Sequence, residues 1–362
     1  MSQAAPLRNI HITKELKFGD GPAYSSGGYV ANAEVDGITN FVANQQWFSR
    51  AVHFGGGAQG GAWSTCYSGC TGTVPEDSAN TYWWDQNGIK QLSFHRATVE
   101  ETPEVRVEKP FIAMEKINGE DHYQLIVPSS TTDEDGVKGP KIDGKYSDNE
   151  IRCFSQVKVG MPNLPKGTDK DGKNNAYIDH NDESYNTLTP ADEELTNELQ
   201  AALDAGKDLV LCPGLFFLTK PLIVKHPNQV ILGLGLATLI APQDGSPCIR
   251  VEKKLPGVRI AGMTLEGSLQ TGNYNSGLQN TDGIRSLIDV GEPGVEDAGD
   301  PSNPILLADI FTRVGGSNLE RKNVETDAMV RIHSGNVVGK NICLSEHVIT
   351  LLKSTSIAFI LY

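Results

Sequence analysis

The chain has 362 residues, 38% of them hydrophobic, and a formal net charge of −14. This length allows a sizeable core and about two domains. The excess of acidic over basic residues, 45 against 31, disfavours nucleic acids and polyanionic polysaccharides as partners, because basic tracks usually hold both. We find no apolar run of about 18 residues, which argues against a membrane-spanning segment. The first residues lack the charged start and apolar stretch of a signal peptide.

Short apolar runs punctuated by glycine recur along the first 55 residues. They begin at Leu7, Tyr29 and Trp47. One strand-bearing unit per about 20–30 residues is typical of a solenoid, in which each coil is buried by its neighbours. Asn9 and Asn32 take the same place in the first two coils, and we predict that they form an internal asparagine ladder. The same spacing places Gln3 over Ser26, and Gln45 falls at about the same corner.

Residues 55–61 read as a flexible glycine-rich loop that leads into an aromatic stretch. The stretch contains Trp63, Trp83 and Trp84, which form either a platform for stacking sugars or a small satellite core; the sequence favours neither. Cys66 and Cys70 are the first and last residues of the short loop-like segment Cys-Tyr-Ser-Gly-Cys. Loose thiols or one local disulfide suit them better than a zinc site, because two further ligands are missing nearby.

A polar segment with one helix separates the two halves. Thr189 is a good N-cap, and Pro190 suits the first helical position. Leu195, Leu199 and Leu203 then recur at helical spacing, and Gly206 is placed to end the helix. We predict that this helix caps a second solenoid, which begins at residue 209. Acidic clusters at 169–172 and 179–183 have the oxygen ligands that calcium prefers, but a solvated linker is the favoured interpretation.

Several motifs of both halves resemble one group of proteins. They are residues 2–10, 25–31 and 44–48 in the first half, and residues 206–214, 230–239 and 311–316 in the second. The chain is similar there to tandem right-handed parallel β-helix proteins of the pectate-lyase-like superfamily. These include the family-55 glycoside hydrolases, which are exo-acting β-1,3-glucanases, and uncharacterised microbial secreted proteins.

The resemblance implies an all-β fold with parts of two right-handed parallel β-helices and one short capping helix. The expected domains are 1–128, the C-terminal part of a first β-helix with a loop insertion; 129–208, a polar linker with the capping helix; and 209–362, the N-terminal part of a second β-helix. In this family two β-helices lie side by side with the binding groove between them. The chain is therefore expected to be a partial one.

The resemblance also implies a division of catalytic work. Gln3, Ser26 and Gln45 would position the attacking water, and a carboxylic acid from the second helix would protonate the leaving oxygen, as an inverting glycosidase requires. Candidates for the acid are Glu266, Asp289, Asp309, Asp327 and Glu346, none of which stands in a distinguishing motif. Glu346 is selected as a catalytic candidate because His347 follows it.

These observations predict a secreted or cell-surface carbohydrate-active protein of the β-1,3-glucanase-like type, acting on or binding a neutral glucan. Whether it is an enzyme stays open at this point. The alternatives are a non-catalytic β-helix adhesin or carbohydrate-binding module, and thirdly a polysaccharide lyase, which the acidic charge disfavours. We expect no cofactor, no metal, no nucleic acid and no membrane partner; the oligomeric state is open. A Gln45 side chain that points into the coil interior would contradict the enzyme hypothesis.

Overall fold

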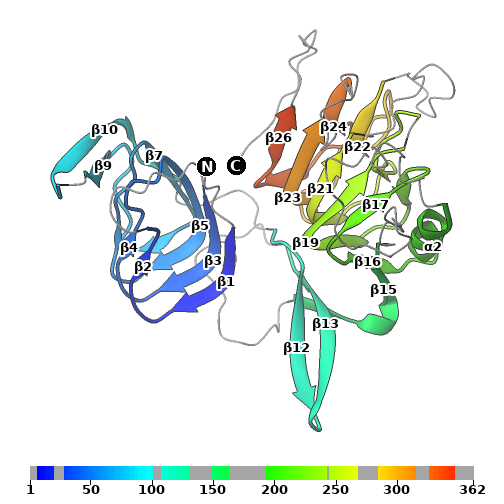
Figure 1. Cartoon of the computed structure of the whole chain (residues 1–362), viewed down its shortest axis with the longest axis horizontal. Coiled ribbons are helices and arrows are strands. Elements are labelled where there is room, and N and C mark those ends of the chain that lie inside the picture. The colour runs from blue at the N-terminus through cyan, green and yellow to red at the C-terminus, as the bar shows by residue number, and fades with distance from the viewer. Residues whose placement is uncertain are drawn as a thin grey trace, which may run out of the picture. The chain divides into compact units, whose positions relative to one another are not determined.

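The computed structural model is built almost entirely of β-strands (Figure 1). It divides into two compact units: unit 1 comprises Met1–Arg106 and Ser130–Asp148, and unit 2 comprises Val107–Ser129 and Asn149–Tyr362. Within the residues that the structure describes, no helix is long and apolar enough to span a membrane. The structure describes residues 6–19, 28–85, 87–100, 107–130, 149–162, 193–242, 244–267, 284–314 and 326–346.

Two parallel sheets run through the successive coils of unit 1. The strand order is β1-β3-β5-β7-β11 in the larger sheet, with β8 also paired to β5, and β2-β4-β6 in the smaller one. The bounds are β1 Leu7–Ile12, β2 Leu16–Lys17, β3 Tyr29–Val35, β4 Thr39–Asn40, β5 Gln46–Phe54, β6 Ala58–Gln59, β7 Ser64–Ser68, β8 Thr71–Gly72 and β11 Thr98–Glu100.

The register shows that each pass of the chain adds one strand to both sheets. In the larger sheet Leu7 pairs with Val30, an offset of 30 − 7 = 23, and Tyr29 pairs with Phe48, an offset of 48 − 29 = 19. In the smaller sheet Leu16 pairs with Thr39 and Thr39 with Ala58, which repeats the offsets 23 and 19. Identical offsets in two sheets mean that whole coils stack on one another. The recurring strand units of the sequence are therefore present as stacked parallel strands.

The glycine-rich segment 55–61 is ordered by this stacking, contrary to the flexible loop that its composition suggests. β6 lies within it and pairs with β4. A Cβ at Gly56 would lie 2.4 Å from the carbonyl carbon of Gly37, so the backbones of successive coils approach too closely for any side chain. Glycine here permits close coil packing instead of loop mobility.

The predicted asparagine ladder is present in unit 1. Asn9 and Asn32 both adopt left-handed backbone conformations, with φ of 54° and 49°. The Asn32 Nδ2 donates to Asn9 Oδ1 at 2.5 Å. Asparagine tolerates this conformation better than most residues, and here the two amides satisfy one another where the strands bend. The structural interpretation of this pair is confirmed.

Unit 1 also carries an antiparallel excursion and an apolar core. Strands β9 (Asn80–Trp84) and β10 (Lys90–Arg96) pair antiparallel to each other. The core lies between the parallel sheets, where aromatic rings of Phe41, Trp47 and Tyr67 pack together. Its buried members are Val30, Ala33, Phe41, Trp47, Val52, Phe54, Tyr67 and Ala97.

Unit 2 repeats the arrangement on a larger scale. One parallel sheet has the order β15-β16-β19-β21-β23-β25, with β17 also paired to β19 and β26 to β23, and a second has the order β18-β20-β22-β24. The bounds are β15 Val157–Gly160, β16 Asp208–Leu211, β17 Leu215–Phe217, β18 Leu222–Val224, β19 Val230–Ile240, β20 Ile249–Val251, β21 Arg259–Glu266, β22 Ser286–Val290, β23 Ile305–Val314, β24 Ala328–Ile332, β25 Val337–Lys340 and β26 Cys343–Glu346.

Unit 2 begins earlier in the chain than the predicted second domain. Strands β12 (Phe111–Ile117), β13 (Glu120–Pro128) and β14 (Asn149–Cys153) form an antiparallel sheet that clusters with unit 2. The expected domain boundaries at 128/129 and 208/209 place β12 and β13 in the first domain and β14 and β15 in a linker. Strand β15, which follows the short 3-10 helix Phe154–Gln156, pairs with β16 and so already belongs to the parallel sheet.

The predicted helix α2 (Glu193–Asp204) covers the first coil of unit 2 (Figure 1). Leu195, Leu199 and Leu203 are buried in the core of this unit, as their spacing predicts. Gly206 has a φ of 74°, and the Lys207 N–H bonds to the Ala202 carbonyl at 3.0 Å, which ends the helix as a Schellman motif does. The predicted cap at Thr189 lies outside the described residues.

One side chain of α2 replaces a missing strand. β18 is an edge strand of its sheet. The Gln200 Oε1 accepts the Ile223 N–H at 2.7 Å, and its Nε2 donates to the Ile223 carbonyl at 3.1 Å. The amide thus pairs both backbone groups of one β18 residue, as a neighbouring strand would. The helix is therefore a structural cap.

Replacing Gln200 with alanine should lower the free energy of unfolding by about 1–3 kcal/mol, because two backbone groups of β18 lose their partners. Urea denaturation followed by circular dichroism measures this loss. Asn197→Ala is the matched control on the exposed face of the same helix and should change stability by less than about 0.5 kcal/mol. Equal effects of the two substitutions would contradict the capping role.

Candidate functional site

The register of unit 1 brings Gln45 beside Trp63. Gln46 pairs with Ser64 across β5 and β7, and the Ser64 N–H donates to the Gln45 carbonyl at 2.9 Å. Gln45 and Trp63 therefore occupy the same place on successive coils. Gln45 is half-buried, and Trp63 is 44% exposed. Gln45, which the sequence suggested for positioning water, and Trp63, which it suggested for stacking sugar, therefore lie side by side at one corner of the coils.

The Gln45 side chain does not lie in the coil interior. The buried position is taken by its neighbour Asn44, which is only 1% exposed. Among the described residues, no side chain or backbone group forms a hydrogen bond with the Gln45 amide. An accessible amide without a partner is available to a bound molecule.

Gln3 and Ser26 lie outside the described residues. The measured strand offsets of 23 and 19 equal the separations from Gln3 to Ser26 (26 − 3) and from Ser26 to Gln45 (45 − 26). Their catalytic role stays a prediction.

Side chains of the antiparallel strands β9 and β10 hold the backbone of Trp63 in place. Its carbonyl accepts hydrogen bonds from Thr81 Oγ1 at 2.6 Å and from Ser93 Oγ at 3.1 Å. The His95 ring lies 6.1 Å from the Trp63 ring, centre to centre, at an interplanar angle of 37°. These contacts hold the indole at the surface, where a flat face is available for stacking.

Trp83 and Trp84 have different surroundings, because alternate residues of a strand point to opposite faces. Trp83 packs against the small buried cluster of Val42, Ala43 and Ala62. Trp84 stands edge-on to Tyr82, with ring centres 5.2 Å apart. Trp83 thus fits the satellite-core alternative, whereas Trp63 is the aromatic residue beside Gln45. The predicted binding role of all three stays a prediction.

Two of the candidate carboxylates in unit 2 are engaged in structural contacts. Asp309 is buried, accepts from Lys109 Nζ at 2.8 Å and from Asn341 Nδ2 at 2.7 Å, and has a φ of 51°. Asp327 accepts two hydrogen bonds of 3.0 Å from the guanidinium of Arg285. Hydrogen bonds from Arg285 hold the pKa of Asp327 below its ordinary value, which does not suit a proton donor.

Asp289 on β22 is buried beside a hydroxyl group and two guanidinium groups. It is 5% exposed and accepts from Ser286 Oγ at 2.5 Å. Guanidinium nitrogens of Arg331 and Arg250 lie 3.6 and 3.8 Å from its Oδ2. Burial raises the pKa of Asp289, although the Ser286 hydroxyl and the two arginines oppose the shift. A carboxyl group with a raised pKa is a better proton donor near neutral pH.

The other two carboxylates are defined less fully. Glu266, at the end of β21, is 5% exposed. Glu346 is the last residue of β26 and pairs with Val314 of β23; its side chain lies outside the described part. The catalytic role of Glu346 therefore stays a prediction.

The pairing of Asp327 with Arg285 predicts a dependence of stability on pH. Hydrogen bonds from Arg285 hold the pKa of Asp327 below its ordinary value of 3.8. A carboxylate whose pKa is lowered by folding stabilises the fold fully at pH values above its ordinary pKa. This stabilisation is lost as the pH falls through the lower pKa of the folded state. Asp327→Asn should therefore cost less than about 1 kcal/mol at neutral pH, because the carboxylate is 44% exposed, and nothing at strongly acidic pH. Urea titrations at several pH values measure this difference; a difference that persists unchanged in acid would contradict it.

All six cysteines are free thiols, including Cys66 and Cys70, for which a local disulfide was one of two expectations. Burial raises the pKa of Cys66 to about 11 and that of Cys70 to about 12. Both thiols are therefore protonated near neutral pH and are poor nucleophiles or metal ligands there.

The parallel sheets of unit 2 and the comparisons indicate one class of protein: the chain is similar to the family-55 glycoside hydrolases. Residues 188–347 match the family described as the LAM55 pectate lyase-like domain. The chain is 30% identical over 319 residues to an exo-beta-1,3-glucanase of Streptomyces sp. (strain SirexAA-E / ActE), covering 88% of this chain and 42% of the relative. The expected family resemblance is confirmed.

Two solved structures of sacteLam55A from the same Streptomyces strain are similar to this chain. The first has a TM-score of 0.67 at 25% identity and covers 96% of this chain and 51% of the other. The second, an alanine variant of sacteLam55A in complex with glucose, has a TM-score of 0.66 at 25% identity and covers 95% and 50%. The chain spans about half the length of the relatives that it matches.

Proposed function

We propose that this protein is a secreted β-1,3-glucan hydrolase. The observation that carries the proposal is the corner at which an accessible amide, Gln45, lies beside an exposed, fixed indole, Trp63. The similarity to an exo-beta-1,3-glucanase supports the choice of glucan. The proposed extracellular location rests on the resemblance to microbial secreted proteins.

The detailed fold of the two units is also part of the proposal. We infer that each unit is a right-handed parallel β-helix, because equal strand offsets recur in both sheets of unit 1 and crossovers between parallel strands are right-handed in nearly all proteins. The similarity of unit 2 to a pectate lyase-like domain supports this inference. In such a fold, side chains at one corner of successive coils form a continuous row, which suits a polymeric ligand.

The proposed mechanism is acid-assisted hydrolysis with inversion. Trp63 stacks against the apolar face of a glucosyl ring. Gln45 orients a water molecule through its amide, together with Ser26 and Gln3 of the same row. A carboxylic acid protonates the leaving oxygen, as an inverting glycosidase requires. Water then forms the new C1–O bond as the glycosidic bond breaks, and the proton that the water loses passes to bulk solvent, from which the acid is reprotonated.

The experiment that tests the proposal is a reducing-sugar assay with the full chain on soluble β-1,3-glucan, β-1,4-glucan and polygalacturonate. We expect sugar release from β-1,3-glucan alone. Binding of β-1,3-glucan without hydrolysis would favour the carbohydrate-binding module, the alternative that exposed Trp63 also supports. Unsaturated products from polygalacturonate would favour a lyase.

Trp63→Ala is expected to weaken binding of β-1,3-glucan about tenfold, which corresponds to about 1.4 kcal/mol for one stacked ring. Isothermal titration calorimetry with a soluble oligosaccharide measures this change. Trp84→Ala serves as the control, because Trp84 packs on Tyr82 instead of lying beside Gln45. Similar losses in both variants would show that the hairpin, not the indole at the corner, determines binding.

A further inference from the structure

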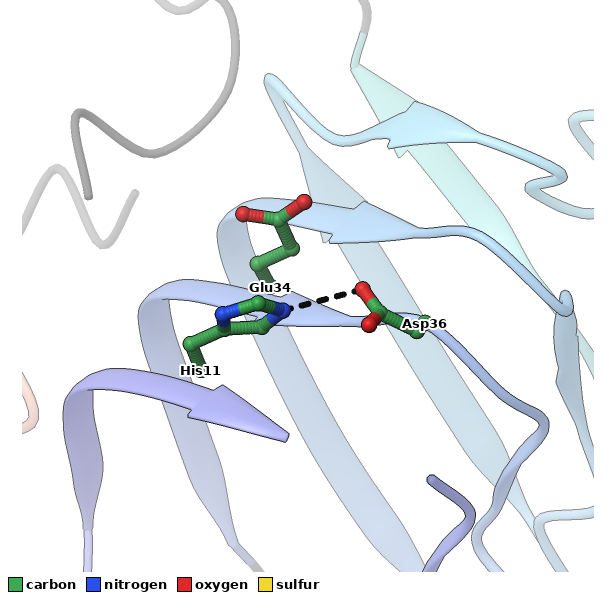
Figure 2. A group of neighbouring side chains, drawn as sticks. All are labelled: His11, Glu34 and Asp36. Carbon is green, nitrogen blue, oxygen red and sulfur yellow. Dashed lines mark hydrogen bonds and ion pairs between the residues drawn. The ribbon is translucent and has the colours of Figure 1, made fainter. Parts of the chain in front are cut away.

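Three side chains with metal-binding atoms gather on the outer face of the larger sheet in unit 1. His11 of β1 pairs with Glu34 of β3, and Asp36 lies two residues further along the same face. One nitrogen of His11 and one oxygen of each carboxylate lie within 4.8 Å of one another. Figure 2 shows the histidine on one strand beside the two acidic side chains of the next.

The strand register places these residues together. Leu7 to Ile12 pair in parallel with Val30 to Val35, so the outward positions of the two strands coincide. The Asp36 N–H bonds to the Ile12 carbonyl at 2.9 Å, which extends the pairing past the end of β3. The backbone of all three residues is therefore fixed by ladder hydrogen bonds, while their side chains stand at the surface.

The distances suit a divalent cation of small radius. Ligand atoms bound tetrahedrally at about 2.0–2.2 Å from zinc lie about 3.4 Å from one another. The His11 Nε2 and Asp36 Oδ1 are 3.0 Å apart. With all three atoms inside 4.8 Å, shifts of about 1 Å or less would bring them onto one ion. Side chains that are 41% exposed at His11 and 46% at Asp36 have room for such shifts.

The donor set selects the kind of cation. Imidazole nitrogen favours first-row transition metals over calcium and magnesium, whereas the two carboxylates supply the charge that a dication needs. Among the described residues, no hydrogen bond or ion pair occupies the Glu34 carboxylate. Three protein ligands leave one position of a tetrahedral site for water.

We propose that His11, Glu34 and Asp36 bind one divalent transition-metal ion of the zinc type, which ties the first two described coils of unit 1 together. The sequence led us to expect no metal. Separations of 23 residues from His11 to Glu34 (34 − 11) and 25 to Asp36 (36 − 11) resemble no short metal motif. The site exists because one coil of that length returns the chain to the neighbouring strand. It is independent of the proposed hydrolysis.

The test is titration of the metal-free full chain with Zn²⁺, Co²⁺ and Ca²⁺ near neutral pH. We expect one equivalent of Zn²⁺ to bind, at least tenfold tighter than Ca²⁺, and His11→Ala to weaken Zn²⁺ binding at least tenfold. The absorption spectrum of the Co²⁺ form should show d–d bands without a thiolate charge-transfer band, because the ligands are nitrogen and oxygen. Circular dichroism establishes that the variant is folded.

His53→Ala is the matched control. His53 is in register with Glu34 on the next strand, β5, but its Nδ1 is bonded to Thr71 Oγ1 at 3.0 Å and it is outside the group of three. Its substitution should leave zinc affinity unchanged within about threefold. Equal losses in His53→Ala and His11→Ala, a thiolate band, preference for Ca²⁺, or no binding of Zn²⁺ would each overturn the proposal.

Discussion

Arg152→Met is expected to lower the free energy of unfolding of unit 2 by about 3–5 kcal/mol, because it leaves a buried carboxylate without its partner. Arg152 Nη1 donates to Asp208 Oδ1 and Oδ2 at 2.9 and 2.8 Å, and to the Asn228 carbonyl at 2.8 Å. Asp208 is 3% exposed. The contact joins β14 of the antiparallel sheet to the first full coil, so its loss separates two elements that are distant in sequence.

The measurement is urea denaturation followed by two signals. All four tryptophans, Trp47, Trp63, Trp83 and Trp84, lie in unit 1, so tryptophan fluorescence reports on unit 1, whereas circular dichroism reports on both units. The loss should appear in circular dichroism, and the fluorescence of the native state should be unchanged.

The control for this substitution is Lys116→Met. Lys116 pairs with Asp121 at 2.7 Å, but the two side chains are 67% and 43% exposed. An exposed pair contributes at most about 1 kcal/mol, so this variant should stay close to the parent protein. A loss below 1 kcal/mol in Arg152→Met as well would show that Asp208 relaxes to another partner or takes up a proton.

The parts of the fold that the sequence predicts are those that depend on local periodicity. The strand units, the amphipathic helix around Leu199 and the ladder of Asn9 and Asn32 all repeat a pattern within one coil length. The Arg152–Asp208 contact joins residues 56 apart, and Arg152 stands in a polar stretch that reads as a linker. Strand-like segments on either side of the Asn118–Gly119 turn do indicate β12 and β13, but no local pattern shows that this hairpin clusters with unit 2. The domain boundary therefore differs from the one expected.

The candidate site shows the same limit. Gln45 and Trp63 are separated by 18 residues (63 − 45), which is the offset between β5 and β7, so extending the coil offsets by one step would have placed them together. The metal-binding group of His11, Glu34 and Asp36 depends on which face each side chain takes. Strand boundaries decide that face, and an error of one residue reverses it. The environment of Asp289 could not be predicted, because its two arginines come from neighbouring strands.

Gln45→Leu is expected to lower kcat for β-1,3-glucan by about 10²-fold or more while KM changes little, because in the proposed mechanism the amide orients the attacking water and Trp63 binds the sugar. Leucine keeps most of the side-chain volume and removes both polar atoms. Initial rates of glucose release over a range of substrate concentrations separate kcat from KM. A lower kcat with an unchanged KM would distinguish the two roles, because substituting a residue that only binds sugar would raise KM instead.

Gln46→Leu is the matched control for this prediction. Gln46 is the neighbouring residue of the same type and is exposed, so the same chemical change is made one position away. Its kcat should stay within about twofold of the parent protein. Equal losses in the two variants would assign the effect to the strand instead of the amide. Full activity in Gln45→Leu would remove Gln45 from the proposed mechanism.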